Sequence, residues 1–146
     1  MIALIQRVTQ ARVDVAGETV GSIGPGLLAL IGIQPADTQH NVERMVERLL
    51  AYRIFEDDGG RMNLGLRDTA GGLLLVPQFT LAADTRKGLR PGFSTAAAPE
   101  LARERFSQLV GHARNQYPDK VETGRFGAEM AVSLTNHGPV TFWLDA

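Results

Sequence analysis

The sequence predicts an α+β fold in which mixed β-sheets are covered on one face by two helices. Short β-rich runs fill the first third of the 146-residue chain, and two amphipathic helical stripes follow further along. Strands and helices are mixed without a regular βαβ alternation, and each apolar helix face needs a sheet to cover it. No repeat, low-complexity tract or linker interrupts residues 1–146, so we expect a single domain.

The first third of the chain is predicted to form strands. Turns are expected at Ala16-Gly17 and at Gly24-Pro25-Gly26, because glycine and proline interrupt regular structure. They separate β-rich runs at residues 2–8, 11–15, 18–23 and 27–33. The last run is apolar throughout, which is typical of a strand that is covered on both faces.

Two helices are predicted from apolar residues at helical spacing. Asp37 or Thr38 can cap a helix that runs to about Arg53. A second helix is expected to begin near Pro99, a residue favoured in a first helical turn, and to end before Pro118. The apolar stripe of the first comprises Val42, Met45, Val46, Leu49 and Leu50, and that of the second comprises Ala102, Phe106, Leu109, Val110 and Ala113.

The remaining strands are expected between the helices and in the last quarter of the chain. We expect an extended segment at residues 54–55, a turn at 57–60 and a strand at 72–76. Residues 130–135 show the clearest alternation of apolar and polar side chains. The run Asn136-His137-Gly138-Pro139 is then predicted to reverse the chain into a last strand at 140–144.

Composition excludes several classes of function. The net charge is -1, whereas a protein that holds duplex or long RNA mainly by neutralising phosphates is usually strongly basic. A partner touched only at its end remains compatible with this charge. The absence of cysteine excludes disulfides, thiolate zinc sites and cysteine nucleophiles. No apolar run approaches the roughly 20 residues of a membrane helix, and no signal peptide is recognised, so we expect a cytoplasmic protein with no membrane partner.

The common catalytic patterns are missing from the sequence. His40 and His112 fall on the polar sides of the expected helices and are interpreted as solvated surface residues. His137 lies in the expected final turn, and the acidic residues 56–58 are interpreted as a solvated hairpin end. No histidine pair has metal-ligand spacing, and no nucleophile elbow or glycine-rich phosphate loop is present, so we expect no metal and no cofactor. These patterns alone leave the activity open.

Two loops carry more information. The run Pro77-Gln78-Phe79-Thr80-Leu81 follows a buried-looking strand, and Pro77 cannot donate to a sheet ladder, so we expect neighbouring N–H groups to face a ligand. After it, Arg86, Lys87 and Arg90 place positive charge where a phosphate-bearing ligand could bind, although an ordinary exposed basic loop is equally supported. The second loop is Asn136 to Thr141. By itself it predicts a tight turn with a trans peptide bond, because only about 5–6% of X–Pro bonds are cis.

These loops resemble motifs of the D-aminoacyl-tRNA deacylases of the bacterial and eukaryotic type. The family's Ser-Gln-Phe-Thr motif appears as Pro77-Gln78-Phe79-Thr80, and its Asn-x-Gly-Pro-x-Thr motif appears as Asn136-His137-Gly138-Pro139-Val140-Thr141. The resemblance extends over essentially the full chain. Further matching segments are Ile5-Gln6-Arg7-Val8, Arg53-Ile54-Phe55-Glu56-Asp57, Met62-Asn63-Leu64, Val121 to Ala128 and Trp143-Leu144-Asp145.

The resemblance implies a homodimer that hydrolyses the ester bond of D-aminoacyl-tRNA. The acceptor end of the tRNA would be the partner of the protein, and glycyl-tRNA would be a second substrate. Gly138-Pro139 would be cis, would be supported from beneath by Arg7 and would enter the pocket of the other subunit. There its carbonyl groups would exclude an L-side chain sterically. The expected fold then becomes mixed β-sheets forming a layered pseudo-barrel, with the two helices packed on one face.

The resemblance also assigns residues to the pocket. Gln78, Phe79 and Thr80 would be the catalytic residues, with main-chain N–H groups stabilising the oxyanion. Met130 and Phe93 would form walls around the terminal adenosine, and the basic residues of the loop would contact tRNA. These basic residues are Arg86, Lys87 and Arg90.

One position departs from the family pattern. Pro77 replaces the family's serine and offers neither a hydroxyl nor an N–H, so it cannot be a nucleophile. Thr80 remains a possible nucleophile, but no base is positioned by sequence to activate it. We therefore expect attack by water, assisted by the substrate's ribose 2′-hydroxyl. The alternatives are a non-catalytic module that binds the aminoacyl end of tRNA, and a generic small-ester hydrolase that uses Thr80.

Overall fold

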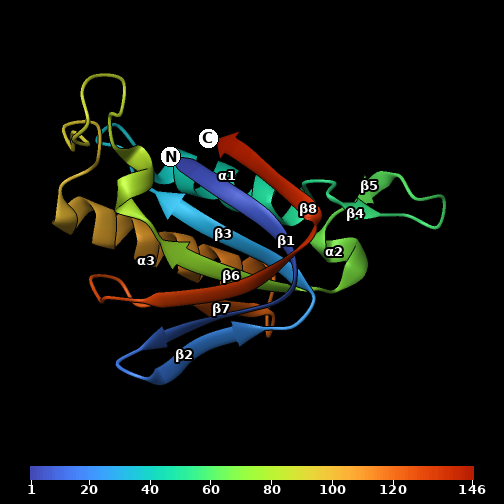
Figure 1. The fold of residues 1–146 in the computed structure, drawn as a ribbon. Helices are drawn as coiled ribbons and strands as arrows, with labels where there is room; N and C mark the ends of the chain where they lie inside the picture. The colour runs from blue at the N-terminus through green and yellow to red at the C-terminus, as the bar shows by residue number, and fades with distance from the viewer.

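A computed structural model describes residues 1–146 and shows a six-stranded mixed sheet backed by two long helices (Figure 1). This is the predicted α+β architecture. A short helix and a single 3-10 turn are additional elements that the sequence did not predict. In chain order the elements are β1 (Ile2–Val15), β2 (Glu18–Ile23), β3 (Gly26–Gly32), α1 (Gln39–Ala51), β4 (Phe55–Glu56), β5 (Met62–Leu64), α2 (Leu66–Thr69), β6 (Gly72–Pro77), η1 (Phe79–Ala82), α3 (Pro99–Gln116), β7 (Val121–Thr123) and β8 (Ala131–Asp145).

The sheet curls into a nearly closed barrel because β1 has several partners. Its first half pairs with β3 and its second half pairs with β2, while β8 runs antiparallel along almost its whole length. On the far side, β3, β6 and β7 are parallel. Gly21 of β2 lies directly against the backbone of Thr123 in β7, where any Cβ would collide. Glycine therefore allows the two ends of the sheet to meet.

Two hydrophobic cores lie on the two faces of the sheet. The larger contains 23 buried residues and fills the space between the sheet and the helices α1 and α3. The smaller contains six residues and lies inside the curl of the sheet. In β3, Leu27 and Ile31 belong to the first core and Leu28 to the second, so this strand is buried on both faces as predicted.

Both predicted helices form, and their apolar stripes face the sheet. The N-cap of α1 is Thr38, whose N–H donates to the side chain of Asn41 at 2.8 Å, and all five predicted stripe residues are buried. Pro99 is the first residue of α3, and only Val110 of its stripe is less than fully buried. Burial of one large apolar side chain typically stabilises a fold by about 1.5–3 kcal/mol. None of the helices is long and apolar enough to cross a membrane.

Two predicted interruptions of strands are wrong. Residues 2–15 form one strand, and residues 136–139 do not reverse the chain. Asn136 pairs with Val8 and Thr141 pairs with Gln6, so residues 137–140 stand opposite Arg7 alone. The extra residues form a bulge in one long strand, because β1 offers a continuous ladder on which β8 resumes pairing.

Candidate active site

An apolar pocket of about 450 Å³ lies where β6 ends and η1 begins. It is bounded on one side by the first turn of α3 and on another by the segment that leads from β7 into β8. Eight of its twelve lining residues are hydrophobic, which suits a small organic group rather than a charged one. The lining residues are Val76, Pro77, Gln78, Phe79, Ala97, Pro99, Ala102, Phe126, Gly127, Ala128, Met130 and Val132.

The pocket brings together three of the residues that the sequence assigned to a site. Gln78, Phe79 and Met130 line it, although Met130 follows Phe79 by about fifty positions in the chain. Phe93 lies beside them, with its ring centroid 5.3 Å from that of Phe79. The two rings are 47% and 58% exposed, so they form an aromatic surface at the side of the pocket that a flat group could cover.

Two main-chain N–H groups are available beside this pocket. The N–H of Gln78 donates to the carbonyl oxygen of Ile31 at 2.7 Å and is therefore occupied. The N–H groups of Phe79 and Thr80 begin the 3-10 turn and have no acceptor within the chain. The expectation that Pro77 frees its neighbours is thus wrong for Gln78, because this residue continues the pairing with β3. The free donors result from the helical turn that follows.

The Thr80 hydroxyl has one hydrogen-bond partner, the side-chain amide of Gln78. An amide does not accept a proton at neutral pH, so it cannot serve as a general base. No histidine, lysine or carboxylate makes a hydrogen bond with Thr80. The arrangement therefore lacks the nucleophile–base pair that covalent catalysis by a hydroxyl requires.

The pocket is also lined by an aromatic residue, Phe126, that the sequence analysis did not assign to the site. Phe126 packs between the guanidinium of Arg103, 4.8 Å from the ring centroid, and the ring of Phe106, at 6.2 Å. Nearby, the sulfur of Met130 accepts a hydrogen bond from the N–H of Arg125 at 3.3 Å. Phe126 belongs to segment 121–128, which resembles the family, and this resemblance was the only sequence signal that Phe126 lies at the site.

Gly138-Pro139 lies in the bulge of β8 and is joined by a cis peptide bond. Arg7 lies beneath it, as the resemblance implied. The Nε of Arg7 donates to the carbonyl oxygen of His137 at 2.9 Å, and its Nη1 donates to that of Ile54 at 2.9 Å. Its Nη2 is 3.9 Å from the carboxylate of Glu56. Arg7 is only 7% exposed, whereas Gly138 and Pro139 are exposed.

The structure does not bring this dipeptide to the pocket of its own chain. Neither Arg7 nor Gly138 nor Pro139 lines that pocket. Arg7 ties the bulge to the chain beside β4, whereas the pocket adjoins η1. Figure 1 shows the β4–β5 hairpin and the loop after η1 at opposite ends of the molecule.

The basic loop after η1 contains one neutralised and two free cations. The guanidinium of Arg86 donates two hydrogen bonds of 2.8 Å to Asp84. These bonds hold the pKa of Asp84 well below its usual range and raise that of Arg86. Lys87 and Arg90 are exposed and make no ion pair. Of the three basic side chains of this loop, only these two therefore add net positive charge.

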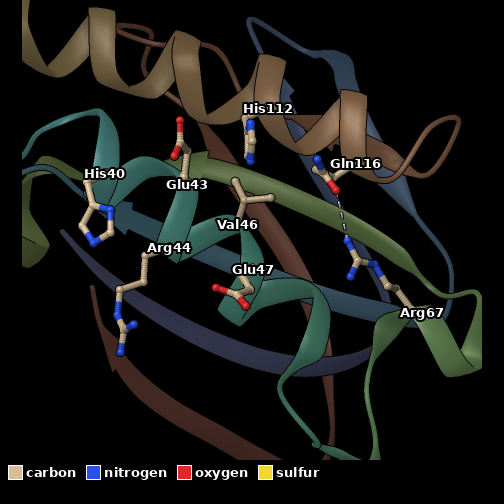
Figure 2. Close-up of a pocket in the computed structure, with 8 residues that line it drawn as sticks. All are labelled: His40, Glu43, Arg44, Val46, Glu47, Arg67, His112 and Gln116. Atoms are coloured by element: carbon tan, nitrogen blue, oxygen red, sulfur yellow. Dashed lines mark hydrogen bonds between the residues drawn. The ribbon is translucent and has the colours of Figure 1, made fainter.

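A second groove, of about 390 Å³, lies between α1 and α3 (Figure 2). His40 and His112 both line it. His40 is exposed as predicted, but His112 is half-buried and faces α1 across the groove. No group of three or more side chains that could hold a metal ion occurs here or elsewhere. None of the sequence-assigned site residues lines this groove.

Comparison with known proteins agrees with the motifs in this pocket. A protein from Thioalkalivibrio sulfidiphilus named D-aminoacyl-tRNA deacylase is 63% identical over 145 residues, which cover 99% of this chain and 97% of that protein. One of the same name from Xanthomonas campestris is 62% identical, with 99% of each chain covered. The solved structure described as c-Myc DNA Unwinding Element Binding Protein superposes with a TM-score of 0.96 at 39% identity, covering 100% of this chain and 99% of the other.

A solved structure described as that of a probable eukaryotic D-amino acid tRNA deacylase has the same fold. Its TM-score is 0.86 at 18% identity, with 99% of this chain and 98% of that one covered. The family model described as D-Tyr-tRNA(Tyr) deacylase matches residues 4–145, which is nearly the whole chain. The chain therefore belongs to the D-Tyr-tRNA(Tyr) deacylase family.

Proposed function

We propose that this protein hydrolyses the ester bond of D-aminoacyl-tRNA and releases the free amino acid and the tRNA. The observation that carries the proposal is the pair of unbonded N–H groups, of Phe79 and Thr80, beside an apolar pocket. Donors of this kind stabilise the negative charge that develops on an ester oxygen. Relatives that are more than 60% identical over the full chain carry the name of this activity.

The proposed reaction needs no protein nucleophile. The oxygen of a water molecule attacks the ester carbonyl carbon, and the carbonyl electron pair moves onto the oxygen beside the two N–H groups. When this tetrahedral intermediate collapses, the C–O bond to the ribose breaks and the ribose oxygen takes up a proton. We assign the handling of the water proton to the neighbouring 2′-hydroxyl of the substrate, because Thr80 is bonded only to an amide. The protein orients the ester and stabilises the charge.

We propose that the terminal adenosine of the tRNA lies against Phe93 and Met130, beside the pocket. The rings of Phe79 and Phe93 offer a surface on which a base can stack. Lys87 and Arg90 then lie on the loop that follows and can meet the phosphates of the acceptor end. The net charge of -1 agrees with a partner that is touched only at its end.

We propose that selection against the L-enantiomer arises between two subunits. Gly138-Pro139 is exposed and lies away from the pocket of its own chain, so it can contribute to a pocket only if that pocket belongs to a second copy. A rigid backbone that occupies the position of an L-side chain rejects it by steric overlap, whereas a D-side chain points elsewhere. Glycine has no Cβ, and glycyl-tRNA is therefore expected to be a second substrate.

The proposal is tested by measuring deacylation of one tRNA charged with the D- and with the L-form of the same amino acid. We expect turnover of the D-ester and protection of the L-ester. Binding of the D-aminoacyl-tRNA without hydrolysis would instead identify a non-catalytic module for the aminoacyl end of tRNA. Equal hydrolysis of both forms would contradict the assigned selectivity.

A pair of variants isolates the contribution of the Phe79 N–H. Phe79→Pro removes both the ring and the N–H, whereas the matched variant Phe79→Ala removes only the ring. Proline is compatible with the first position of a helical turn. We expect kcat of Phe79→Pro to be about 10²–10³-fold below that of Phe79→Ala, which is the usual effect of losing one oxyanion donor. Equal kcat values for the two variants would exclude this N–H from catalysis.

The role of the Thr80 hydroxyl is tested by Thr80→Ala. We expect this variant to retain substantial D-aminoacyl-tRNA hydrolysis, because no base activates the hydroxyl and the main-chain N–H is kept. The measurement is single-turnover deacylation, with circular dichroism as the control for folding. Complete loss of activity in a folded variant, together with an acyl-enzyme detected by mass, would favour the small-ester hydrolase that uses Thr80.

A further inference from the structure

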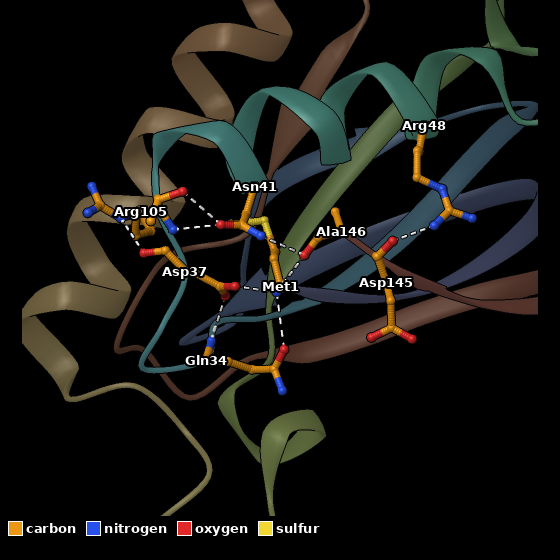
Figure 3. Close-up of polar contacts among 9 residues, drawn as sticks. Met1, Gln34, Asp37, Asn41, Arg48, Arg105, Asp145 and Ala146 are labelled. Atoms are coloured by element: carbon orange, nitrogen blue, oxygen red, sulfur yellow. Dashed lines mark hydrogen bonds and ion pairs between the residues drawn. The ribbon is translucent and has the colours of Figure 1, made fainter.

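The bulge at residues 137–140 is the one part of β8 that has no ladder partner in β1, because the strand pairs with β1 on either side of it. The end of β8 is also tied to α1 (Figure 3). There the side chain of Asn41 donates to the carbonyl oxygen of Ala146 at 2.9 Å. The guanidinium of Arg48 donates to the carbonyl oxygen of Asp145. The bulge lies between two fixed stretches of strand, so contacts of its own determine its shape.

The side chain of Asn136 joins the two ends of the bulge. Its amide oxygen accepts a hydrogen bond from the N–H of Val140 at 2.7 Å, and its amide nitrogen donates to the hydroxyl oxygen of Thr141 at 2.8 Å. Asparagine side chains readily bond to backbone groups a few residues away in the chain. One planar group thus closes the bulge that contains Gly138 and Pro139. We call this arrangement the Asn136 clamp.

Val140 connects the Asn136 clamp to the interior of the protein. Its side chain is half-buried and packs against the larger hydrophobic core. A Cβ on Gly138 would come within 2.7 Å of the Val140 Cγ2 atom and within 3.1 Å of the Arg7 guanidinium. The φ of Gly138 is +137°, which also favours glycine. Because this packing leaves no space, a displacement of Val140 also displaces the exposed dipeptide.

We propose that Asn136 and Thr141 are positioning residues for the selection between enantiomers. Through Val140 they hold the bulge in the conformation in which its backbone excludes an L-side chain. This inference rests on the proposed role of Gly138-Pro139 in the pocket of a second copy. It assigns a task to the two outer residues of the run 136–141, neither of which lines the pocket of its own chain.

The Asn136 clamp acts on a different part of the bulge from Arg7. Arg7 donates to the carbonyl oxygen of His137, at the start of the bulge, whereas Asn136 holds the N–H of Val140 at its end. All of these contacts lie within one chain, so the bulge is preorganised before a second copy meets it. Loss of the clamp leaves the pairing with β1 and the contact with Arg7 in place, and it frees only the end of the bulge.

A steric barrier protects the L-ester only while it is in place. If the bulge leaves its position in a small fraction of molecules, that fraction alone cleaves the L-ester, whereas the D-ester does not meet the bulge and is cleaved by all molecules. The rate of L-ester cleavage thus reports the displaced fraction. Loss of one or two hydrogen bonds typically changes such an equilibrium by about tenfold.

The test measures kcat/KM for D- and L-aminoacyl-tRNA in two variants of Asn136. Asn136→Ala removes both hydrogen bonds. Asn136→Asp keeps one oxygen for the N–H of Val140 and offers the other to the Thr141 hydroxyl, which can rotate to donate. We expect L-ester cleavage to rise about tenfold in Asn136→Ala and to return close to the wild-type rate in Asn136→Asp, while D-ester cleavage changes by less than about twofold in both.

The second arm changes the hydroxyl. Thr141→Val has nearly the same shape but removes one of the two bonds, so L-ester cleavage should rise. Its addition to Asn136→Ala should have no further effect, because the two side chains act as one unit. Thr141→Ser keeps the hydroxyl and should behave as the wild type. The matched control is Asn115→Ala, at an exposed asparagine near the end of α3, where neither ester rate should change.

Hydrogen exchange of the Val140 amide tests the clamp without reference to activity, with the β8 amides that bond to β1 as the internal standard. We expect this exchange to be about tenfold faster in Asn136→Ala than in the wild type or in Asn136→Asp. Unchanged protection of the L-ester in folded Asn136→Ala and Thr141→Val would overturn the proposal, as would an equal change of both ester rates. Equal cleavage of both esters by the wild type would contradict the proposed function itself, and with it the task of the clamp, even where exchange shows that the clamp exists.

Discussion

At the scale of single residues, two buried charges connect parts of the chain that are distant in sequence. Arg7 and Asp37 are the only buried residues with charged side chains. Arg7 joins β1 to the carbonyl groups of Ile54 and His137, and Asp37 joins the start of α1 to Met1. Each charge is matched by hydrogen-bond partners, as burial in a low-dielectric interior requires. Both fix backbone segments rather than contacting the apolar pocket.

The Arg7→Met variant removes the donors but keeps an apolar side chain of similar length. It leaves the carbonyl oxygens of Ile54 and His137 unsatisfied, which is expected to cost about 1–3 kcal/mol each where no water replaces the donor. We also expect discrimination between D- and L-aminoacyl-tRNA to fall more than D-ester hydrolysis, because the bulge loses its support.

The matched control is Arg12→Met, an exposed arginine of the same strand, which should change stability by less than about 1 kcal/mol. Urea unfolding and the two deacylation rates are the measurements, and an unchanged D/L ratio in folded Arg7→Met would contradict the prediction.

At the scale of elements, the last turn of α3 anchors the start of the strand that leads to the pocket. The hydroxyl of Tyr117 lies 3.0 Å from the carbonyl oxygen of Leu66 in α2 and 2.7 Å from that of Gly71, which precedes β6. β6 then runs between β3 and β7 and ends at Pro77. Burial raises the pKa of Tyr117 above its ordinary value, because the ionised phenol is poorly solvated there.

The raised pKa of Tyr117 predicts how stability depends on alkaline pH. The neutral phenol is favoured in the folded state, so its contribution is fully present below the unfolded pKa, near 10, and is lost as pH rises through the folded pKa. Tyr117→Phe should lower the free energy of unfolding by about 0.5–1.5 kcal/mol at neutral pH. Its stability should then decline less steeply than that of the wild type above about pH 10.

Urea unfolding of both proteins at pH 7 and between about pH 9 and 11 measures this difference. Tyr52→Phe is the matched control, since the hydroxyl of Tyr52 makes no hydrogen bond. Parallel stability curves for wild type and Tyr117→Phe at alkaline pH would contradict the prediction.

At the scale of the whole molecule, several exposed features agree with the proposal of a homodimer. Phe79 and Trp143 are 58% and 51% exposed, and Leu134 on β8 is also exposed. The bulge at residues 137–140 projects from the same strand without meeting its own pocket. An interface between two copies would cover apolar surface and would place each bulge against the other chain.

Mixing two variants tests whether the bulge acts between subunits. Pro139→Ala keeps the pocket, removes part of the bulge and is expected to cleave the L-ester about tenfold faster or more. Phe79→Pro keeps the bulge but has a pocket with impaired catalysis. In an equal mixture after subunit exchange, about half of the intact pockets face an intact bulge from the other subunit. The rate of L-ester cleavage per intact pocket should therefore fall to about half. It should fall further when Phe79→Pro is in excess.

The D-ester rate per intact pocket should not change during this titration, which controls for inactivation. Sedimentation measures the dimer and the exchange of subunits. A constant L-ester rate in fully exchanged mixtures would show that the bulge does not act on the other subunit, and a monomer would contradict the proposed arrangement altogether.

The local sequence determined which segments are helical and which strand is buried on both faces. These follow from spacing and composition: α1, for example, has its full apolar stripe in the core. The family motif at residues 77–80 pointed to a loop of which Gln78 and Phe79 line the pocket. Sequence could not decide whether residues 136–139 reverse the chain, because a proline-containing turn has the same local preferences in a hairpin and in a bulge. Only pairing with β1, more than a hundred residues away, excludes the reversal.

Tertiary structure alone also decided which N–H groups remain unbonded and where Phe126 and Met130 meet Gln78. Both depend on long-range contacts. The N–H of Gln78 donates to the carbonyl oxygen of Ile31 in β3, and the pocket forms only when α3 and the segment before β8 pack beside β6. The same holds for the amino group of Met1, whose partners are Gln34 and Asp37, more than thirty residues away, and Ala146. Local propensity carries no information about such partners, since their energies arise only when distant groups are desolvated together.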